Sequence, residues 1–248
     1  MKRAALRNQQ HYKNSGYTTR RVTGKIYGRI SEKEIHRERK LLFRLSEETY
    51  LEGNKMGTER SPIIANEKIE IRFNWDAYPK QRSLGLIGGL MAESTAVDCD
   101  ACAIFCDRKG KPLSAQVKES CLSYDNASMF DGAARHKGDN RTGAGSDDET
   151  IILDLNALPA EVGAIVFTMD LFKERKQSTL GKIQNTFVRI IGTGNTGEIT
   201  RYDFNNLGSN RKLVVCGTLK RESSGWAFLP PRQETLNVSS MDEFIRGL

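Results

Sequence analysis

The chain has 248 residues, of which 38% are hydrophobic, and its formal net charge is +7. No apolar run approaches the roughly 20 residues that a membrane-spanning helix needs, and no apolar stretch of the kind found in secretory signals follows the basic N-terminus. An odd number of cysteines, five, without an export signal favours reduced thiols. We therefore expect a cytoplasmic protein with one main hydrophobic core.

The positive charge is concentrated in the first quarter of the chain. Residues 1–60 contain 15 Lys and Arg against 7 Asp and Glu, whereas the rest contains 23 against 24. Residues 1–30 have no acidic side chain, which predicts a flexible basic arm. This arm is either a solvated tail or a segment that contacts nucleic acid or an anionic lipid surface.

A helical extension is expected over residues 31–60. Ser31 and Glu34 have the spacing of a capping box, in which each side chain satisfies a free backbone amide of the first helical turn. Apolar residues then recur at helical spacing, and Gly53 is a plausible stop. The pattern predicts a helix over about Ser31–Leu51.

From about Ser61 onward the pattern becomes that of β-strands. Apolar residues alternate with polar ones in several short segments that are bounded by Gly, Asn and Asp, and no long helical pattern separates them. This predicts an all-β domain, a two-sheet β-sandwich over residues 61–232. A tail over 233–248 should hold one short helix near Ser240–Ile245. The predicted strands include Ile69–Phe73, Ile165–Leu171, Phe187–Ile191 and Leu213–Leu219.

The segment Gly138–Glu149 concentrates carboxylates in a glycine-rich loop. Closely spaced carboxylates repel one another, and a bound cation would remove that repulsion. Ca²⁺ takes six to eight oxygen ligands from carboxylates, Asn side chains and peptide carbonyls, whereas Mg²⁺ prefers fewer protein ligands. The loop therefore predicts a calcium site, although an exposed acidic turn is the simpler alternative. Its oxygen-bearing side chains are Asp139, Asn140, Asp147, Asp148 and Glu149.

Asp98 and Asp100 offer a second pair of carboxylates. Their i, i+2 spacing places both on one side of an extended chain. The loop does not follow EF-hand spacing, because Arg141 occupies the third position counted from Asp139. A calcium site would therefore have to combine separate loops.

Other chemistry is poorly supported. Cys99, Cys102 and Cys106 are better explained as small buried strand residues than as zinc ligands, since no second cysteine pair has zinc-site spacing. Gly192–Gly197 matches G-x-G-x-x-G, but a strand pattern follows it, which predicts a hairpin turn instead of a dinucleotide site. His136 is the one histidine of the domain, and no nucleophile motif accompanies it, so we expect no enzymatic activity. A metal-dependent hydrolase that uses the Asp cluster is a weaker alternative.

Several segments together resemble the TerD family of calcium-binding tellurium-resistance and stress-response proteins of bacteria. The similarity runs from about Ile63 to Phe228, and its most specific piece is Lys137-Gly-Asp-Asn-Arg-Thr-Gly143 followed by Asp147-Asp-Glu149. Residues 1–60 and the tail after Pro231 have no counterpart in it. The other matching pieces, in the family's order, are Asn74-Trp-Asp76, Val97–Ala101, Ser123–Asn126, Leu158–Val162, Thr186–Arg189, Arg201–Phe204 and Trp226.

The resemblance implies a non-enzymatic β-sandwich that binds one or two Ca²⁺ ions at one end. It also implies protein partners in stress-response complexes, some of them associated with the membrane, so that a peripheral membrane location is an alternative to a purely cytoplasmic one. The rival hypothesis is a nucleic-acid or anionic-membrane adaptor that acts through residues 1–60. Asp76 is a weaker candidate ligand. The implied ligand donors are Asp98, Asp100, Asp139, Asn140, Asp147, Asp148 and Glu149.

Overall fold

The computed structural model describes residues between Ile63 and Leu248, with gaps. The expected basic arm and the helix at Ser31–Leu51 lie outside the described residues. These are 63–65, 67–77, 97–140, 147–171, 179–194, 197–204, 207–208, 211–231, 235–236 and 238–248.

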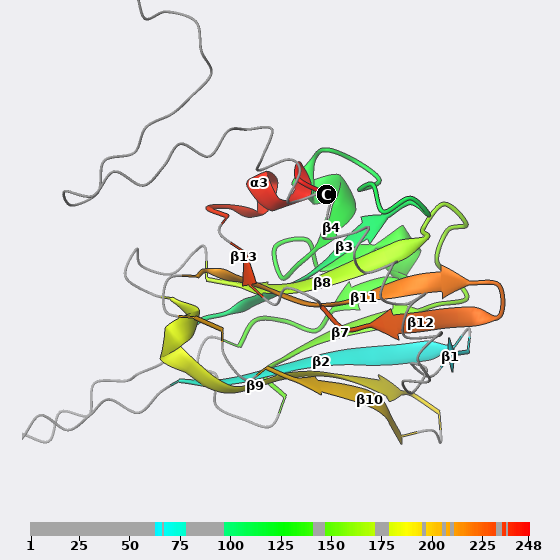
Figure 1. Cartoon of the computed structure of the whole chain (residues 1–248). Coiled ribbons are helices and arrows are strands. Elements are labelled where there is room, and N and C mark those ends of the chain that lie inside the picture. The colour runs from blue at the N-terminus through cyan, green and yellow to red at the C-terminus, as the bar shows by residue number, and fades with distance from the viewer. Residues whose placement is uncertain are drawn as a thin grey trace, which may run out of the picture.

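The described residues form two antiparallel sheets that pack face to face, which confirms the predicted all-β sandwich (Figure 1). The first is a seven-stranded sheet in the order β1-β12-β11-β8-β3-β4, and β13 also pairs with β11. Its strands are β1 (Ile63–Ile64), β3 (Asp100–Cys106), β4 (Cys121–Leu122), β8 (Ala164–Asp170), β11 (Leu213–Glu222), β12 (Gly225–Leu229) and β13 (Thr235–Leu236).

The second is a six-stranded sheet in the order β10-β9-β2-β7-β6-β5. Strands β9 and β10 form a hairpin in which Gly192 pairs with Gly197, so the predicted turn at this glycine-rich motif is confirmed. Strand β10 is the edge of the sheet, and its pairing is interrupted between Glu198 and Thr200. The strands are β2 (Lys68–Ala77), β5 (Ser128–Met129), β6 (Ala134–His136), β7 (Glu149–Asp154), β9 (Ile183–Gly192) and β10 (Gly197–Asp203).

The main core lies between the two sheets. Ile69, Ile71 and Phe73 of β2 are fully buried, as the alternation of this segment predicts, while Glu70 and Arg72 point to the other face. Phe73 also makes an edge-to-face contact with Phe167 of β8, with ring centroids 6.3 Å apart, which joins the sheets. Burial of these apolar faces supplies the main driving force for the fold.

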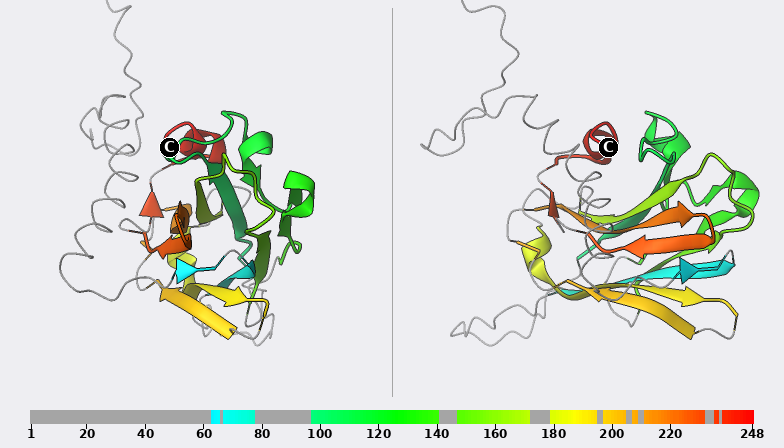
Figure 2. Two further views of the ribbon diagram at one scale, coloured as in Figure 1. Left: turned by 90° about the vertical axis from the view of Figure 1, so that its right-hand side faces the viewer. Right: turned by 45° about the vertical axis from the view of Figure 1, so that its right-hand side comes forward.

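Strands β3 and β8 are buried on both faces, which simple alternation does not predict. On the outer face of their sheet, Cys102, Ile104 and Val166 form a second apolar cluster. The C-terminal residues Phe244 and Ile245 pack on this cluster and are 4% and 2% exposed. Figure 2 shows the C-terminal segment on the side of this sheet that faces away from the six-stranded sheet.

The C-terminal helix α3 (Met241–Ile245) confirms the short capped helix that the sequence predicts. Its N-cap is Ser240, whose hydroxyl accepts a hydrogen bond from the Glu243 amide at 3.1 Å. Among the described residues, no helix has the length and apolar character needed to cross a membrane. The remaining helical turns are α2 (Val117–Ser120), η1 (Phe130–Gly132) and η2 (Leu180–Lys182).

A carboxylate cluster at one end of the sandwich

Three strand ends bring acidic side chains to the same end of the molecule. Asp100 is the first residue of β3 and pairs with Asp170, the last residue of β8, because these neighbouring strands are antiparallel. Glu149 is the first residue of β7 in the other sheet. All three are buried, at 6%, 4% and 1% exposure. Carboxylates are rarely buried in this way unless a partner compensates their charge.

Glu149 links the two sheets. Its Oε2 atom accepts a hydrogen bond of 2.7 Å from the amide of Ala101 on β3, and its Oε1 atom accepts one of 3.4 Å from the Asn140 amide. The loop that ends at Glu149 and the segment that contains Asp98 and Asp100 are therefore neighbours in space, although about 50 residues separate them in the sequence.

His136 lies beside Glu149. Its Nε2 atom is 3.3 Å from Glu149 Oε2, and both side chains are 0% exposed. The Nδ1 atom accepts a hydrogen bond from the Gly138 amide at 3.2 Å, so the other ring nitrogen, Nε2, is the one that faces the carboxylate. Nε2 lacks the geometry of a hydrogen bond. The histidine is thus buried at the acidic end of the domain.

Asp148 binds the backbone of β2 at a point where the pairing of the six-stranded sheet is irregular. The pairing of β2 with β9 shifts between Asn74 and Asp76, and the Trp75 amide donates instead to Asp148 Oδ2 at 2.9 Å. The side-chain amide of Asn140 donates to the other carboxylate oxygen at 3.0 Å. Burial raises the pKa of Asp148, and the charges of Asp76, Asp147 and Glu149 act in the same direction, against the hydrogen bond from Trp75.

Cys99 lies among the acidic residues at this end. Burial raises the pKa of the Cys99 thiol well above its usual range, and the charges of Asp170, Glu149, Asp100 and Asp98 raise it further. Cys99 faces the core between the sheets, whereas Cys102 and Cys106 lie on the opposite face of their sheet, and all three are buried as predicted.

The structure brings most of the predicted ligand residues together, but not all. Asp98 and Asp100 flank Cys99 at the start of β3, and Glu149 accepts a hydrogen bond from the Ala101 amide that follows them. Asn140 donates hydrogen bonds to both Glu149 and Asp148. Half-buried Asp139 precedes Asn140 directly in the chain. Within the described part of the chain, however, no group of three or more Asp, Glu, His or Cys side chains is arranged to hold a metal ion.

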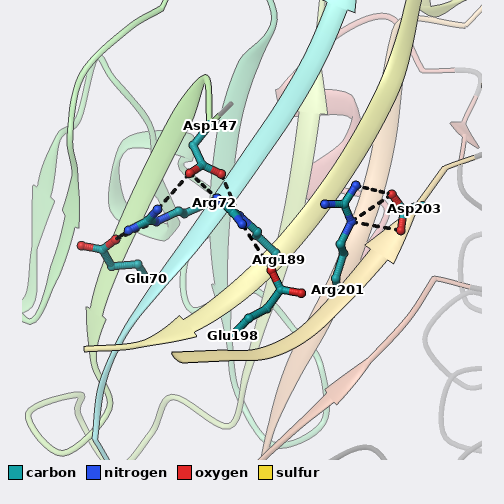
Figure 3. Close-up of polar contacts among 7 residues, drawn as sticks. All are labelled: Glu70, Arg72, Asp147, Arg189, Glu198, Arg201 and Asp203. Carbon is teal, nitrogen blue, oxygen red and sulfur yellow. Dashed lines mark hydrogen bonds and ion pairs between the residues drawn. The ribbon is translucent and has the colours of Figure 1, made fainter. Parts of the chain in front are cut away.

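Two of the predicted residues have other partners. Asp76 accepts a hydrogen bond of 2.6 Å from the Asn185 side chain. Asp147 turns to the outer face of the six-stranded sheet, where Arg72 and Arg189 bind its carboxylate (Figure 3). It is therefore separated from Asp148 and Glu149, which point inward.

Asp170 is the acidic residue that sequence reasoning missed. It lies at the end of an apolar strand pattern, which marks it as a strand-end carboxylate. Its pairing with Asp100 depends on β8 lying next to β3, and the sequence does not reveal that neighbourhood. His136 was recognised as the histidine of the domain, but its burial against Glu149 depends in the same way on long-range packing.

The fold and its acidic end together define a two-sheet sandwich protein with buried carboxylates at one end, of which Glu149 connects the two sheets. The model of the TerD domain family matches residues 59–233, and the chain therefore belongs to the TerD family. This confirms the resemblance that its motifs carry.

The chain is similar to proteins that are named for resistance and stress. Tellurium resistance protein TerD of Serratia marcescens is 32% identical over 178 residues, which cover 71% of this chain and 84% of that protein. Stress response protein SCP2 of Bacillus subtilis is 28% identical over 181 residues, covering 72% and 87%. The crystal structure of a homologue of telluride resistance protein (TerD) from Streptomyces coelicolor matches with a TM-score of 0.50 at 18% identity, covering 70% of this chain and 91% of that one. This structural match shows the shared fold.

Proposed function

We propose that this chain is a calcium-binding stress-response protein without enzymatic activity, which holds one or two Ca²⁺ ions at the carboxylate cluster. The observation that supports this most is the position of Glu149. Its buried carboxylate extends from the six-stranded sheet to β3, where it accepts a hydrogen bond from the Ala101 amide, directly after Asp100 in the chain. Several carboxylates buried at one end repel one another, and a divalent cation would reduce that repulsion.

The chemistry of the donors fits a hard cation. Carboxylates and an Asn side chain supply oxygen ligands, which Ca²⁺ accepts in flexible geometry. Within the described residues, His136 is the only imidazole beside the cluster, and burial raises the pKa of the Cys99 thiol while the hydrogen bond with Cys121 and burial raise that of Cys102. A single histidine with two protonated thiols is a poor set for a transition metal. The residues that would hold the ion are Asp98, Asp100, Asp139, Asn140, Asp148 and Glu149, with Asp170 as an addition from the structure.

Ion binding would act on the fold through charge. A bound Ca²⁺ ion would offset the charge of carboxylates from both sheets, so it would stabilise the folded state in which those carboxylates lie close together. At a hundredfold excess of Ca²⁺ over its Kd, linkage adds about 2.7 kcal/mol to the free energy of unfolding. The ordered acidic end would then offer a defined surface to a protein partner.

Isothermal calorimetry with Ca²⁺ and thermal melting of the full chain test the metal site. We expect saturable heat and a rise in Tm of roughly 5–10 °C, with Mg²⁺ at the same concentration producing a smaller shift. Glu149→Gln should weaken calcium binding strongly. The matched control is Glu161→Gln, which changes an exposed glutamate in a loop and should leave binding unchanged. Absence of heat and of a melting shift at millimolar Ca²⁺ would reject the site.

The biological role is proposed from the family to which the chain belongs. Relatives of this chain carry the names of tellurium resistance and stress response, and we propose the same general role here, in the cytoplasm or at the membrane periphery. Residues 1–60, with 15 basic against 7 acidic side chains, are the segment best suited to an anionic partner such as nucleic acid or lipid headgroups. Binding of this kind would weaken steeply with added salt and disappear when residues 1–60 are deleted.

A further inference from the structure

Three consecutive acidic residues, Asp147, Asp148 and Glu149, diverge to opposite faces of the six-stranded sheet. Asp148 and Glu149 turn inward, where they bond to the amides of Trp75 and Ala101. Asp147 turns outward and is 13% exposed at its side chain. Sequence spacing alone assigns all three to one metal site, so the outward position of Asp147 calls for a separate explanation.

Two arginines hold Asp147 on the outer face (Figure 3). Arg189 binds it with two nitrogens, Nε to Oδ1 at 2.8 Å and Nη2 to Oδ2 at 2.5 Å. Arg72 donates from Nη1 to Oδ2 at 2.9 Å. Paired hydrogen bonds between a guanidinium and a carboxylate fix the angle as well as the distance of the acid, which a single contact to lysine would not do.

The arginines are themselves fixed by the sheet. Arg72 of β2 and Arg189 of β9 are register partners on neighbouring strands, so their guanidinium groups lie side by side. Glu70 binds Arg72 at 2.8 and 2.6 Å, and Glu198 binds Arg189 at 3.3 Å. Two adjacent cations repel unless an anion lies between them, and Asp147 occupies that place. The positive charges of Arg72 and Arg189 therefore stabilise the Asp147 carboxylate in its position between them.

The backbone connects this outer group with the inner cluster. The Asp148 amide donates to the Phe73 carbonyl at 2.8 Å, one peptide unit away from the carboxylate that the arginines hold. With Asp147 fixed outside, the backbone that carries Asp148 and Glu149 is fixed as well. Acidic side chains that repel each other would otherwise be free to spread apart.

We propose that Asp147 is an anchor and not a calcium ligand, and that Arg72 and Arg189 are positioning residues that fix Asp148 and Glu149 for the metal. The inference rests on the proposed calcium-binding function. Arg72, Asp147 and Arg189 would then support the site from the opposite face of the sheet, without contacting the ion. Residues of such a layer change metal affinity without touching the metal.

The two roles of Asp147 predict opposite results when Arg189 is changed. If Asp147 is an anchor, loss of the guanidinium frees the loop and calcium affinity falls. If Asp147 is instead a ligand that Arg189 withholds, the change releases a carboxylate and removes a positive charge, and calcium affinity rises. The sign of the change in Kd therefore decides between them.

Calorimetric calcium titration of four full-length proteins tests the proposal: wild type, Arg189→Met, Arg189→Lys and Arg201→Met. For Arg189→Met we expect a Kd roughly 10–100-fold higher with unchanged stoichiometry. Arg189→Lys retains the charge without the paired hydrogen bonds and should fall between wild type and Arg189→Met. Arg201 lies on the same face, where it binds Asp203 and not Asp147, so Arg201→Met should stay within about twofold of wild type.

Amide hydrogen exchange of the calcium-free proteins provides a second measurement. The segment 147–154 should exchange faster in Arg189→Met than in wild type, while β8 should not change. Unchanged or tighter calcium binding by Arg189→Met, or unchanged exchange at 147–154, would overturn the anchor. A wild-type protein that binds no calcium would overturn the proposed function, and the exchange rates would still show whether Arg189 orders the loop.

Discussion

The outer faces of the two sheets differ in what stabilises them: ion pairs on one face and a covering apolar segment on the other. On the six-stranded sheet, Arg72 and Arg189 are 30% and 22% exposed and are satisfied by acids of the same face. On the seven-stranded sheet, Ile104 and Val166 are apolar and need the C-terminal residues around Phe244 to exclude water. One face is completed by its own strands, and the other depends on a segment from elsewhere in the chain. Stability should therefore respond very differently to changes on the two faces.

Truncation of Phe244 should produce the largest effect. This side chain is 4% exposed and packs on the outer cluster of β3 and β8. We expect Phe244→Ala to lower the free energy of unfolding by about 3 kcal/mol, since it removes buried apolar contacts and leaves a cavity. Urea unfolding measures this. Arg246→Ala changes an exposed residue next to the same helix and should cost less than about 0.5 kcal/mol. Similar losses for both variants would show that the segment is not a cover.

The same cover should protect the thiols beneath it. Burial raises the pKa of Cys106 to about 12, with a further contribution from the charge of Asp107. Because the thiolate is the reactive form, alkylation requires the segment to open first. We expect Phe244→Ala to accelerate alkylation of Cys102 and Cys106 by roughly 10–100-fold under native conditions, in line with a weaker cover. Mass spectrometry of labelled peptides follows each site. Equal rates in wild type and variant would contradict this view.

Removal of the charge of Asp147 should have an intermediate effect that depends on pH. Burial raises its pKa, but hydrogen bonds from Arg189 and Arg72 outweigh burial and lower it below the usual 3.8. A lowered folded pKa stabilises the fold above the unfolded value, and this contribution is lost as pH falls through the folded value. Asp147→Asn should cost about 1–2 kcal/mol near neutral pH, and the difference should shrink below about pH 4. A constant difference from about pH 7 to pH 2.5 would argue against the ion pairs.

The smallest effect is expected at the exposed end of the same face. Asp203 binds Arg201 at 2.7 Å, but the side chains are 58% and 39% exposed, so water and salt screen the pair (Figure 3). Asp203→Asn should change the free energy of unfolding by less than about 0.5 kcal/mol. Chemical denaturation of both variants, Asp203→Asn and Asp147→Asn, measures the two losses in the free energy of unfolding. A loss as large as that of Asp147→Asn would mean that partial burial does not set the strength of these pairs.

The sequence predicted strand β2 of the six-stranded sheet well because local alternation and burial agree there. Ile69, Ile71 and Phe73 face the core, while Glu70 and Arg72 face outward, as period-two patterning requires. The double burial of Val166 could not be predicted in this way. It results from Phe244 and Ile245, which lie some 80 residues further along the chain.

The acidic end was predicted in composition but not in arrangement. The cluster of carboxylates in Gly138–Glu149 is visible in one short segment, and its meeting with Asp100 was expected from the resemblance to known proteins. The outward turn of Asp147 depends on the register between Arg72 and Arg189, and the inclusion of Asp170 depends on the neighbour of β3. Both are properties of strand order, which periodicity does not encode.

The irregular edge strand β10 has a consequence for association between molecules. An edge strand presents unpaired backbone donors and acceptors, and regular edges of this kind recruit further strands into growing aggregates. Here the register shift between Glu198 and Thr200 interrupts the regular spacing of these backbone groups, and the strand carries the charged residues Glu198, Arg201 and Asp203. The irregular, charged edge is therefore a poor template for lateral polymerisation.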